Sequence, residues 1–211
     1  GIIGVGNVGS KIAQVGQELG MRVLIKYKVN RLPIDIMQIC IDEGFTLLPY
    51  SRMGDGLKQL GFTDHAGQTD GFSLRYQNRL LLFYDDTANK QRQRFTIGHE
   101  LGHYLNGDVT AQPTYRNREP SATDDPRETA ANVTASRILS PACVLWHLGL
   151  TEASDIARAC DISQTAAEWR AERLRKLIER DKEFHRKYGH GSFLMSPLER
   201  QVYRQFFGTE R

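Results

Sequence analysis

Two histidines and a glutamate within five residues constrain this chain more than any other feature. The segment reads His99, Glu100, Leu101, Gly102, His103. Four residues advance a helix by a little over one turn, so both imidazoles leave the same face and can bind one ion. Imidazole is a good ligand for Zn²⁺, and a carboxylate beside the ion can take a proton from water. This spacing is typical of the metal-binding helix in zinc peptidases.

The pattern around the motif predicts a helix over residues 94–105, because apolar side chains recur there at helical spacing. The expected buried face consists of Ile97, Leu101, Tyr104 and Leu105. A glycine inside a helix costs roughly 1 kcal/mol relative to alanine, so Gly98 and Gly102 indicate close approach by a second helix or by a substrate. The alternative is an amphipathic helix that carries two histidines by chance.

A working zinc site needs a third protein ligand and one position open to water. Residues 125–141 predict a second helix, with Asp125 as its N-cap, Pro126 in its first turn and Pro141 at its end. Its expected packing face consists of Ala131, Ala135, Ile138 and Leu139. Glu128 lies on its first turn and could reach the metal, but a glutamate there could equally serve only the helix dipole.

At these positions the chain resembles the ImmA/IrrE-type metallopeptidases. The resemblance covers residues 28–170 approximately and rests on residues 94–103, Arg127, Glu128, Ala131, Asn132, Ala135, Leu139, Ser140 and Pro141. It implies that His99, His103 and Glu128 bind zinc and that Glu100 is the catalytic base. The chain departs from the family pattern at two packing positions, where Thr134 replaces an aromatic residue and Ser140 replaces methionine.

The same resemblance implies an endopeptidase that cleaves a protein, namely a helix-turn-helix repressor of a phage, a mobile element or a stress response. The alternative is a catalytically silent, zinc-stabilised adaptor that binds a repressor or DNA, although the intact Glu100 argues against it. Residues that could help to stabilise the oxyanion are His147, Tyr104 and Tyr115.

We predict an α+β fold, in which a small antiparallel or mixed sheet packs on a helical core that carries the histidine helix. A helix is expected to begin at Leu32 and Pro33 and to end at Gly44, followed by a strand over residues 45–48. Residues 72–76 and 80–84 predict a hairpin that turns at Gln77 and Asn78. The strand just before the histidine helix could bind substrate along a free edge, or the hairpin could be purely structural.

The chain of 211 residues, 40% hydrophobic and 25% charged, suits one domain with an appendage. We predict an N-terminal arm over residues 1–28, a zinc metallopeptidase domain over 29–148 and a helical, helix-turn-helix-like region over 149–211. The three cysteines, Cys40, Cys143 and Cys160, are widely spaced and are expected to be buried thiols. We find neither a membrane span nor a signal pattern, and expect a cytoplasmic protein.

The first residues carry a separate motif, because Gly4, Gly6 and Gly9 follow the spacing of a dinucleotide fingerprint. Residues 1–25 resemble the nucleotide-binding start of D-2-hydroxyacid dehydrogenases. The strand-like residues 21–25 are followed by basic residues instead of an acid, and further strand-helix units are missing. We therefore expect no dinucleotide site, and interpret the segment as a helix-bearing arm or as a segment foreign to the peptidase.

Near the C-terminus, residues 154–174 predict two short helices with the spacing of a helix-turn-helix. Their expected apolar side consists of Ala166, Ala167, Trp169 and Leu174. Basic residues could contact phosphates, namely Arg170, Arg173, Arg175 and Lys176, but Glu168, Glu172, Glu179 and Arg180 mix both signs of charge among them. With a net charge of only +3, we interpret this as a solvated face and do not expect direct nucleic-acid binding. Residues 181–191 form a polar stretch, and 197–207 predict a last amphipathic helix.

Overall fold

The computed structural model describes residues 5–59, 69–110, 114–115, 125–188 and 195–208. Its Cα positions form two compact units. Unit 1 comprises Gly1–Leu19 and Asp35–Ser136, and unit 2 comprises Gly20–Ile34 and Arg137–Arg211. The chain passes from one unit to the other inside helices α1 (Val5–Lys26) and α5 (Pro126–Leu139). The predicted limits of the peptidase domain, residues 29–148, remain a prediction.

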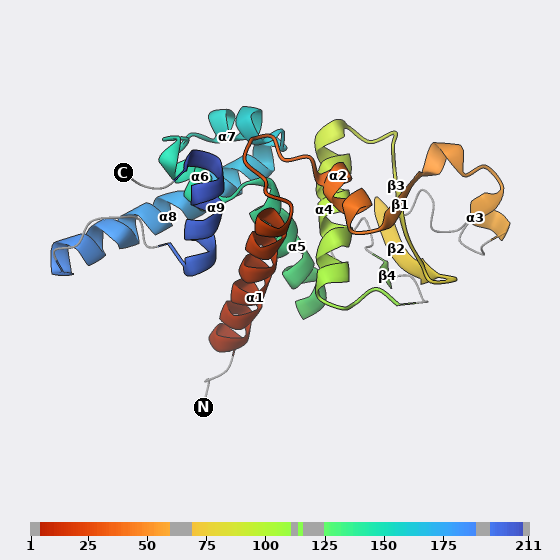
Figure 1. The fold of residues 1–211 in the computed structure, drawn as a ribbon, viewed down its shortest axis with the longest axis horizontal. Helices are drawn as coiled ribbons and strands as arrows, with labels where there is room; N and C mark the ends of the chain where they lie inside the picture. Colours follow the sequence, from red (N-terminus) through yellow and green to blue (C-terminus); the bar gives the residue numbers. More distant parts are fainter. Residues whose placement is uncertain (1–4, 60–68, 111–113, 116–124, 189–194, 209–211) are drawn as a thin grey trace. The chain divides into compact units, whose positions relative to one another are not determined.

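Unit 1 is built on a mixed four-stranded sheet with the order β1-β3-β2-β4 (Figure 1). The strands are β1 (Phe45–Pro49), β2 (Gly71–Tyr76), β3 (Arg79–Tyr84) and β4 (Thr114–Tyr115). β3 pairs in parallel with β1 and antiparallel with β2, and β4 pairs antiparallel with β2. The structure therefore confirms the α+β class with a mixed sheet.

The predicted hairpin is confirmed, with Tyr76 opposite Arg79 across its turn. Gln77 and Asn78 both have positive φ, 45° and 62°, as a type I′ turn requires. Of the two alternatives for this hairpin, substrate binding along a free edge of the strand before the histidine helix is wrong, because β3 lies between β1 and β2 and is hydrogen-bonded on both sides.

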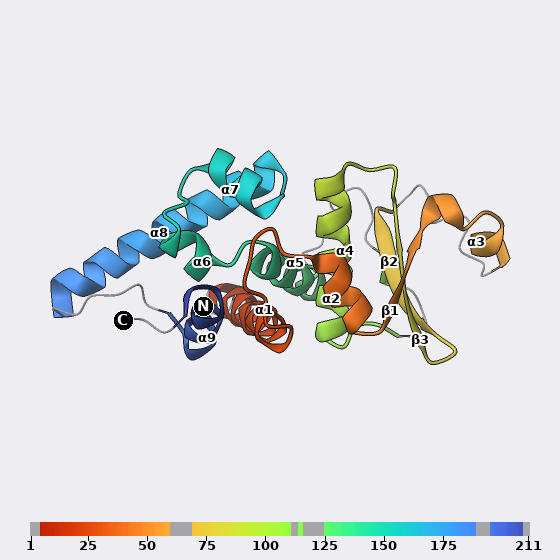
Figure 2. The same ribbon diagram turned by 45° about the horizontal axis from the view of Figure 1, so that its top comes forward.

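Alternating side chains give this sheet two different faces. Phe72 and Leu74 of β2 pair with Phe83 and Leu81 of β3, and the rings of Phe72 and Phe83 stack at 4.7 Å. These four residues form a buried cluster with Leu57 of the short helix α3 (Gly56–Gln59), which follows the 3-10 turn η1 (Tyr50–Arg52). Helices α2 (Ile36–Asp42) and α4 (Lys90–Leu105) lie on the opposite face (Figures 1 and 2).

Helix α2 begins four residues later than predicted. Asp35 caps it by accepting a hydrogen bond from the backbone N–H of Gln38 at 3.1 Å, which satisfies a donor at the helix start. The helix is followed by Gly44, whose φ of +92° leads into β1. The end of the helix and the strand after it are thus confirmed, and its start is corrected.

At the N-terminus, the helix expected in the arm is confirmed, because α1 is continuous over Val5–Lys26; it takes in Gly6, Gly9 and the strand-like residues 21–25. A short apolar run cannot by itself distinguish a strand from a buried helical segment. Met21, Val23 and Leu24 are buried within unit 2. The dinucleotide resemblance is thus carried by a segment that is helical from Val5 onward.

Unit 2 is otherwise helical, with α6 (Ala142–His147), α7 (Ala153–Cys160), α8 (Gln164–Tyr188) and α9 (Pro197–Phe207). α7 packs against α8 (Figure 2). Gln205 of α9 donates hydrogen bonds to the carbonyl oxygens of Leu24 and Val29 at 3.0 and 3.1 Å. The helical C-terminal region and its last helix are confirmed. Among the described residues, no helix is long and apolar enough to cross a membrane.

The two helices expected within residues 154–174 are confirmed as α7 and α8, but the second is not short, because α8 has 25 residues and extends into the polar stretch 181–191. The expected apolar side is wrong at one residue. Trp169, expected on the apolar side, is 72% exposed, whereas Arg170 is only 3% exposed and its Nε donates to Ser140 Oγ at 2.9 Å. The packing face of α8 is formed by the buried residues Ala167, Ala171 and Leu174. Arg170 lies beside this face, and Trp169 lies on the opposite side of the helix.

Candidate metal centre

Helix α4 brings the two motif histidines together as their spacing predicts. Asn89 caps the helix by accepting from the N–H of Arg92 at 2.9 Å, and the motif begins nearly three turns later. His99 and His103 are each 1% exposed, and their Nε2 atoms lie 3.0 Å apart. Both imidazoles therefore present the same ring nitrogen to one point in the interior of unit 1.

Helix α5 adds the carboxylate of Glu128 to this point. Asp125 caps α5 by accepting from the N–H of Arg127 at 2.9 Å, which places Glu128 on the first turn. The Glu128 oxygens lie 3.3 Å from Nε2 of His99 and 3.1 Å from Nε2 of His103. Sequence spacing alone left open whether Glu128 serves the helix dipole or the metal, and the structure places it with both histidines.

The glycines of α4 allow the two helices to approach this closely. A Cβ added at Gly102 would lie 2.8 Å from both Cα and the carbonyl oxygen of Ala131 in α5. At Gly98 the nearest contact would be Ala135 Cβ at 3.4 Å. The predicted close approach is thus made by a second helix, and it is tightest beside His103.

Each imidazole is oriented by a partner on its other nitrogen. Nδ1 of His99 lies 3.0 Å from Oδ1 of Asn132, and Nδ1 of His103 lies 3.0 Å from Oδ2 of Asp108. Because both partners offer an oxygen that accepts from Nδ1, Nε2 of each ring is left as the nitrogen that can bind a metal once its own proton is displaced. Asn132 was predicted only as part of the family motif, and Asp108 was missed because it lies in the loop after α4.

Charges in the site oppose the cost of burial. Burial lowers the pKa of His103, but the hydrogen bonds to Glu128 and Asp108 and the charge of Glu100 outweigh it and raise that pKa to about 9. Burial raises the pKa of Glu128, while hydrogen bonds from His103 and His99 hold it well below its usual range. In the metal-free protein a proton therefore occupies the place between these groups that a cation would take.

The donor set and its spacing fit a zinc ion. One nitrogen from each histidine and one carboxylate oxygen lie within 4.8 Å of one another. Ligands about 2.0–2.1 Å from a tetrahedral zinc are separated by about 3.3 Å, close to the distances found here. The Glu128 side chain remains 26% exposed, so solvent can reach the site beside this carboxylate.

Glu100, between the histidines, is buried and held by a residue from the sheet. Its side chain is 1% exposed, and Oε2 accepts a hydrogen bond from Oγ of Ser73 at 2.7 Å. Ser73 is fully buried on β2, between Phe72 and Leu74, which belong to the other face. Sequence analysis missed Ser73, although the strand's period of two places it on the face toward α4.

Comparison with known proteins agrees with this geometry. Residues 60–173, just over half of the chain, match the peptidase family model described as the IrrE N-terminal-like domain. The chain belongs to this family. None of the curated proteins compared with the chain matches it. The family model begins later than the resemblance noted in the sequence, and it spans both α4 and α5.

The two departures from the family pattern are both buried, as expected of packing positions. Thr134 is fully buried, and its hydroxyl donates to the carbonyl oxygen of Ala130 at 2.9 Å within α5. Ser140 is 2% exposed and accepts the hydrogen bond from Arg170. At both positions a small hydroxyl side chain is thus buried and hydrogen-bonded.

The structure gives no oxyanion role to the candidates from sequence. Tyr104 packs edge-on against Phe45, with ring centroids 5.2 Å apart. His147 belongs to unit 2, where its Nδ1 lies 2.9 Å from the hydroxyl of Tyr203. The side chain of Tyr115 lies outside the described residues. Their proposed roles remain predictions.

Cys40, Cys143 and Cys160 are buried thiols outside any disulfide, as expected. Burial is the main cause that raises the pKa of the Cys143 thiol to about 12. Cys40 donates a weak hydrogen bond to the carbonyl oxygen of Ile97 at 3.9 Å. Burial raises the pKa of the Cys40 thiol as well, so neither Cys40 nor Cys143 is a candidate for a nucleophile.

Proposed function

We propose that the chain is a zinc-dependent endopeptidase in which His99, His103 and Glu128 hold the metal and Glu100 is the catalytic base. One observation carries the proposal: two oriented Nε2 atoms and a carboxylate from a second helix meet at one buried point. Membership of a peptidase family supports it. When bound, zinc supplies Lewis-acid activation of water and of the peptide carbonyl.

Glu100 supplies the proton transfers that hydrolysis requires. The hydrogen bond from Ser73 occupies Oε2, so Oε1 is the oxygen that takes a proton from the attacking water. As the peptide bond breaks, the same oxygen returns that proton to the leaving amine nitrogen, while the carbonyl carbon keeps the hydroxyl group. Burial of Glu100 limits competing exchange with bulk water.

We propose a protein as the substrate, specifically a helix-turn-helix repressor. The peptidase family supports a protein substrate in general. The repressor rests on the resemblance to ImmA/IrrE-type enzymes alone. The catalytically silent adaptor is the second candidate, and it differs only in whether Glu100 acts.

Metal analysis and cleavage together test the proposal. The purified chain should bind about one zinc, His99→Ala should lose it, and the matched control His147→Ala should keep it. A candidate repressor encoded beside the chain is then incubated with the parent and with Glu100→Gln. Cleavage by the parent alone supports the peptidase, and equal cleavage by both would remove Glu100 from the mechanism. Zinc binding without cleavage of that repressor would favour the adaptor.

A further inference from the structure

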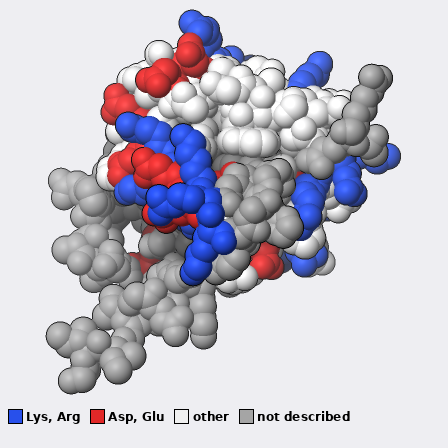
Figure 3. All heavy atoms as spheres, turned by 90° about the vertical axis from the view of Figure 1, so that its left-hand side faces the viewer, with Lys and Arg blue, Asp and Glu red and all other residues white. Residues whose placement is uncertain are grey.

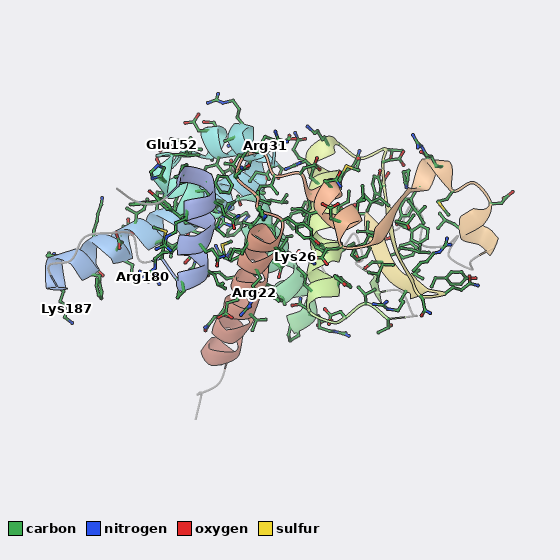
Figure 4. The ribbon with its side chains drawn as sticks, viewed as in Figure 1. Arg22, Lys26, Arg31, Glu152, Arg180 and Lys187 are labelled. Atoms are coloured by element: carbon green, nitrogen blue, oxygen red, sulfur yellow. The ribbon has the colours of Figure 1, made fainter. Side chains whose placement is uncertain are left out.

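Helix α8 presents an exposed row of basic and aromatic side chains. At 100° per residue, five residues fall within a sector of about 60°. They are Trp169, Arg173, Lys176, Arg180 and Lys187, all of them exposed. We call this row the α8 stripe, and it runs about 27 Å along the helix axis. Figure 4 shows Arg180 and Lys187 along the same side of α8.

The buried residues of α8 confirm that the stripe faces solvent within unit 2. Ala167, Ala171 and Leu174 are each 4% exposed or less, and they lie on the opposite side of the helix. Trp169 is 72% exposed, far more than a tryptophan that contributes to a core. An aromatic ring left in water beside cations is a feature of binding surfaces rather than of a purely solvated helix face.

The two arginines of the stripe are available for an anionic partner. Among the described residues, Arg173 and Arg180 make no ion pair or hydrogen bond, while Lys176 pairs with Glu172. Arg173 and Arg180 are seven residues apart, which separates them by about 10 Å along one side of the helix. Their guanidinium groups can therefore contact successive anionic groups of one extended molecule.

The charge of the whole unit favours a polyanion. Unit 2 contains 17 Lys and Arg against 10 Asp and Glu, a net charge of +7, whereas unit 1 contains 11 against 15, a net charge of −4. The net charge of +3 for the whole chain is the sum of these two opposite charges. Figure 3 shows Lys and Arg side chains gathered where α8 points toward the viewer, with acidic side chains among them. A field of this size attracts a ligand with many negative charges more than one with a single acidic patch.

We propose that the α8 stripe binds a single strand of nucleic acid, with Trp169 stacked on a base and Arg173 and Arg180 on backbone phosphates. Acidic residues follow one side of the stripe, namely Glu172, Glu179 and Glu183. A duplex would bring phosphates of its second strand over that acidic row, whereas one strand can follow the stripe alone. Aromatic stacking with a row of cations is the usual means of binding single strands without sequence preference.

The test uses the full-length chain and fluorescein-labelled 20-nucleotide DNA, single-stranded or as the matching duplex, in fluorescence anisotropy. We expect the single strand to bind more tightly than the duplex, with an affinity that falls as salt rises. Arg173→Ala with Arg180→Ala should weaken binding about tenfold and make it less dependent on salt. Trp169→Ala should weaken it about tenfold, and Trp169→Phe should restore most of the loss.

Arg175→Ala with Lys182→Ala is the matched control, because it removes two exposed cations from a different side of the same helix. An equal loss in this control would overturn the assignment to the stripe. Absence of binding by the parent, or tighter binding of polyglutamate than of DNA, would overturn the choice of a nucleic acid. Circular dichroism checks that all variants fold. Binding is measured without cleavage, so the result is independent of the proposed peptidase activity.

Discussion

Helices α4 and α8 both carry charged and aromatic side chains at helical spacing, yet they use them in opposite ways. In α4 the polar groups of the motif are buried, and each imidazole meets a partner at both ring nitrogens. In α8 the charged side chains of the stripe are exposed to solvent, and Trp169 is exposed beside them. The difference shows that spacing determines a site when the groups must meet at one point, but not when they only share a face.

The largest effect should come from removing the base and leaving the metal site intact. Glu100→Gln should keep about one zinc and lower kcat by about 10² to 10⁴ fold, because the amide cannot accept the proton. Zinc content and cleavage of the candidate repressor are measured on the same sample. A variant that loses zinc as well would show that Glu100 is one of the metal ligands, which would contradict its assignment as the base in α4.

The partner of His103 provides the next test. Asp108→Ala should weaken zinc binding by about 10 to 100 fold, because the imidazole loses the acceptor that orients it. Competition with a chelator of known affinity measures the zinc dissociation constant. Asp155→Ala, which removes an acidic residue from unit 2, is the control and should leave zinc affinity unchanged. Equal affinity in both variants would contradict a role for Asp108.

The packing of α4 on α5 predicts opposite outcomes for two glycines on one helix. Gly102→Ala should destabilise the protein by roughly 1–3 kcal/mol, because its Cβ would overlap the backbone of Ala131. The Cβ of Gly98→Ala would lie 3.4 Å from Ala135 Cβ and 3.6 Å from Ile36 Cγ1, which are ordinary contacts, so this variant should be neutral or stabilised by up to about 1 kcal/mol. Urea denaturation of the metal-free protein measures both, and equal effects would contradict the close approach at Gly102.

The pH dependence of zinc binding follows from His103. Its pKa of about 9 in the metal-free protein means that zinc must displace a proton at neutral pH. The apparent affinity should therefore rise by up to about tenfold per pH unit from pH 6.5 and level off near pH 9. The same proton stabilises the metal-free fold below pH 6.5, and that contribution is lost as pH rises through 9. Calorimetry in a metal-buffered solution would contradict this if the affinity were flat over the range.

The smallest effect concerns the residue that holds the base. Ser73→Ala should lower kcat by about tenfold with KM and zinc content unchanged, because Glu100 loses one hydrogen bond without losing its carboxylate. Ser73→Thr, which keeps the hydroxyl, should recover part of the rate. A loss of folding or of zinc in Ser73→Ala would indicate a structural role instead.

Much of the metal centre could be predicted because its signals are local. The four-residue spacing of His99 and His103, the glycines beside them and the cap at Asp125 all act within one or two turns of a helix. Ser73 and Asp108 could not be found in this way, because their roles depend on how β2 and the loop after α4 pack against the motif. For Glu128 the spacing predicted its position on the second helix but left its direction open, and only the family resemblance implied that it is a metal ligand.

The errors elsewhere have the same origin. The mixed charges and short apolar positions of residues 154–188 do not determine which side of a helix packs, so Trp169 and Arg170 were placed on the wrong sides. The apolar residues 21–25 suit a strand or a helix equally. In the structure they belong to α1, and Met21, Val23 and Leu24 are buried within unit 2. In both segments tertiary packing decided what the local pattern left open.

X-ray absorption at the zinc edge of the metal-loaded protein tests the central claim most directly. We predict a shell of nitrogen and oxygen at about 2.0–2.1 Å with scattering from two imidazoles, and no such shell in His99→Ala, which does not retain the zinc. Glu128→Gln should change the oxygen part of the shell and leave both imidazoles in place. Sulfur scattering near 2.3 Å, or a spectrum identical in the parent and both variants, would contradict a site made of these three residues.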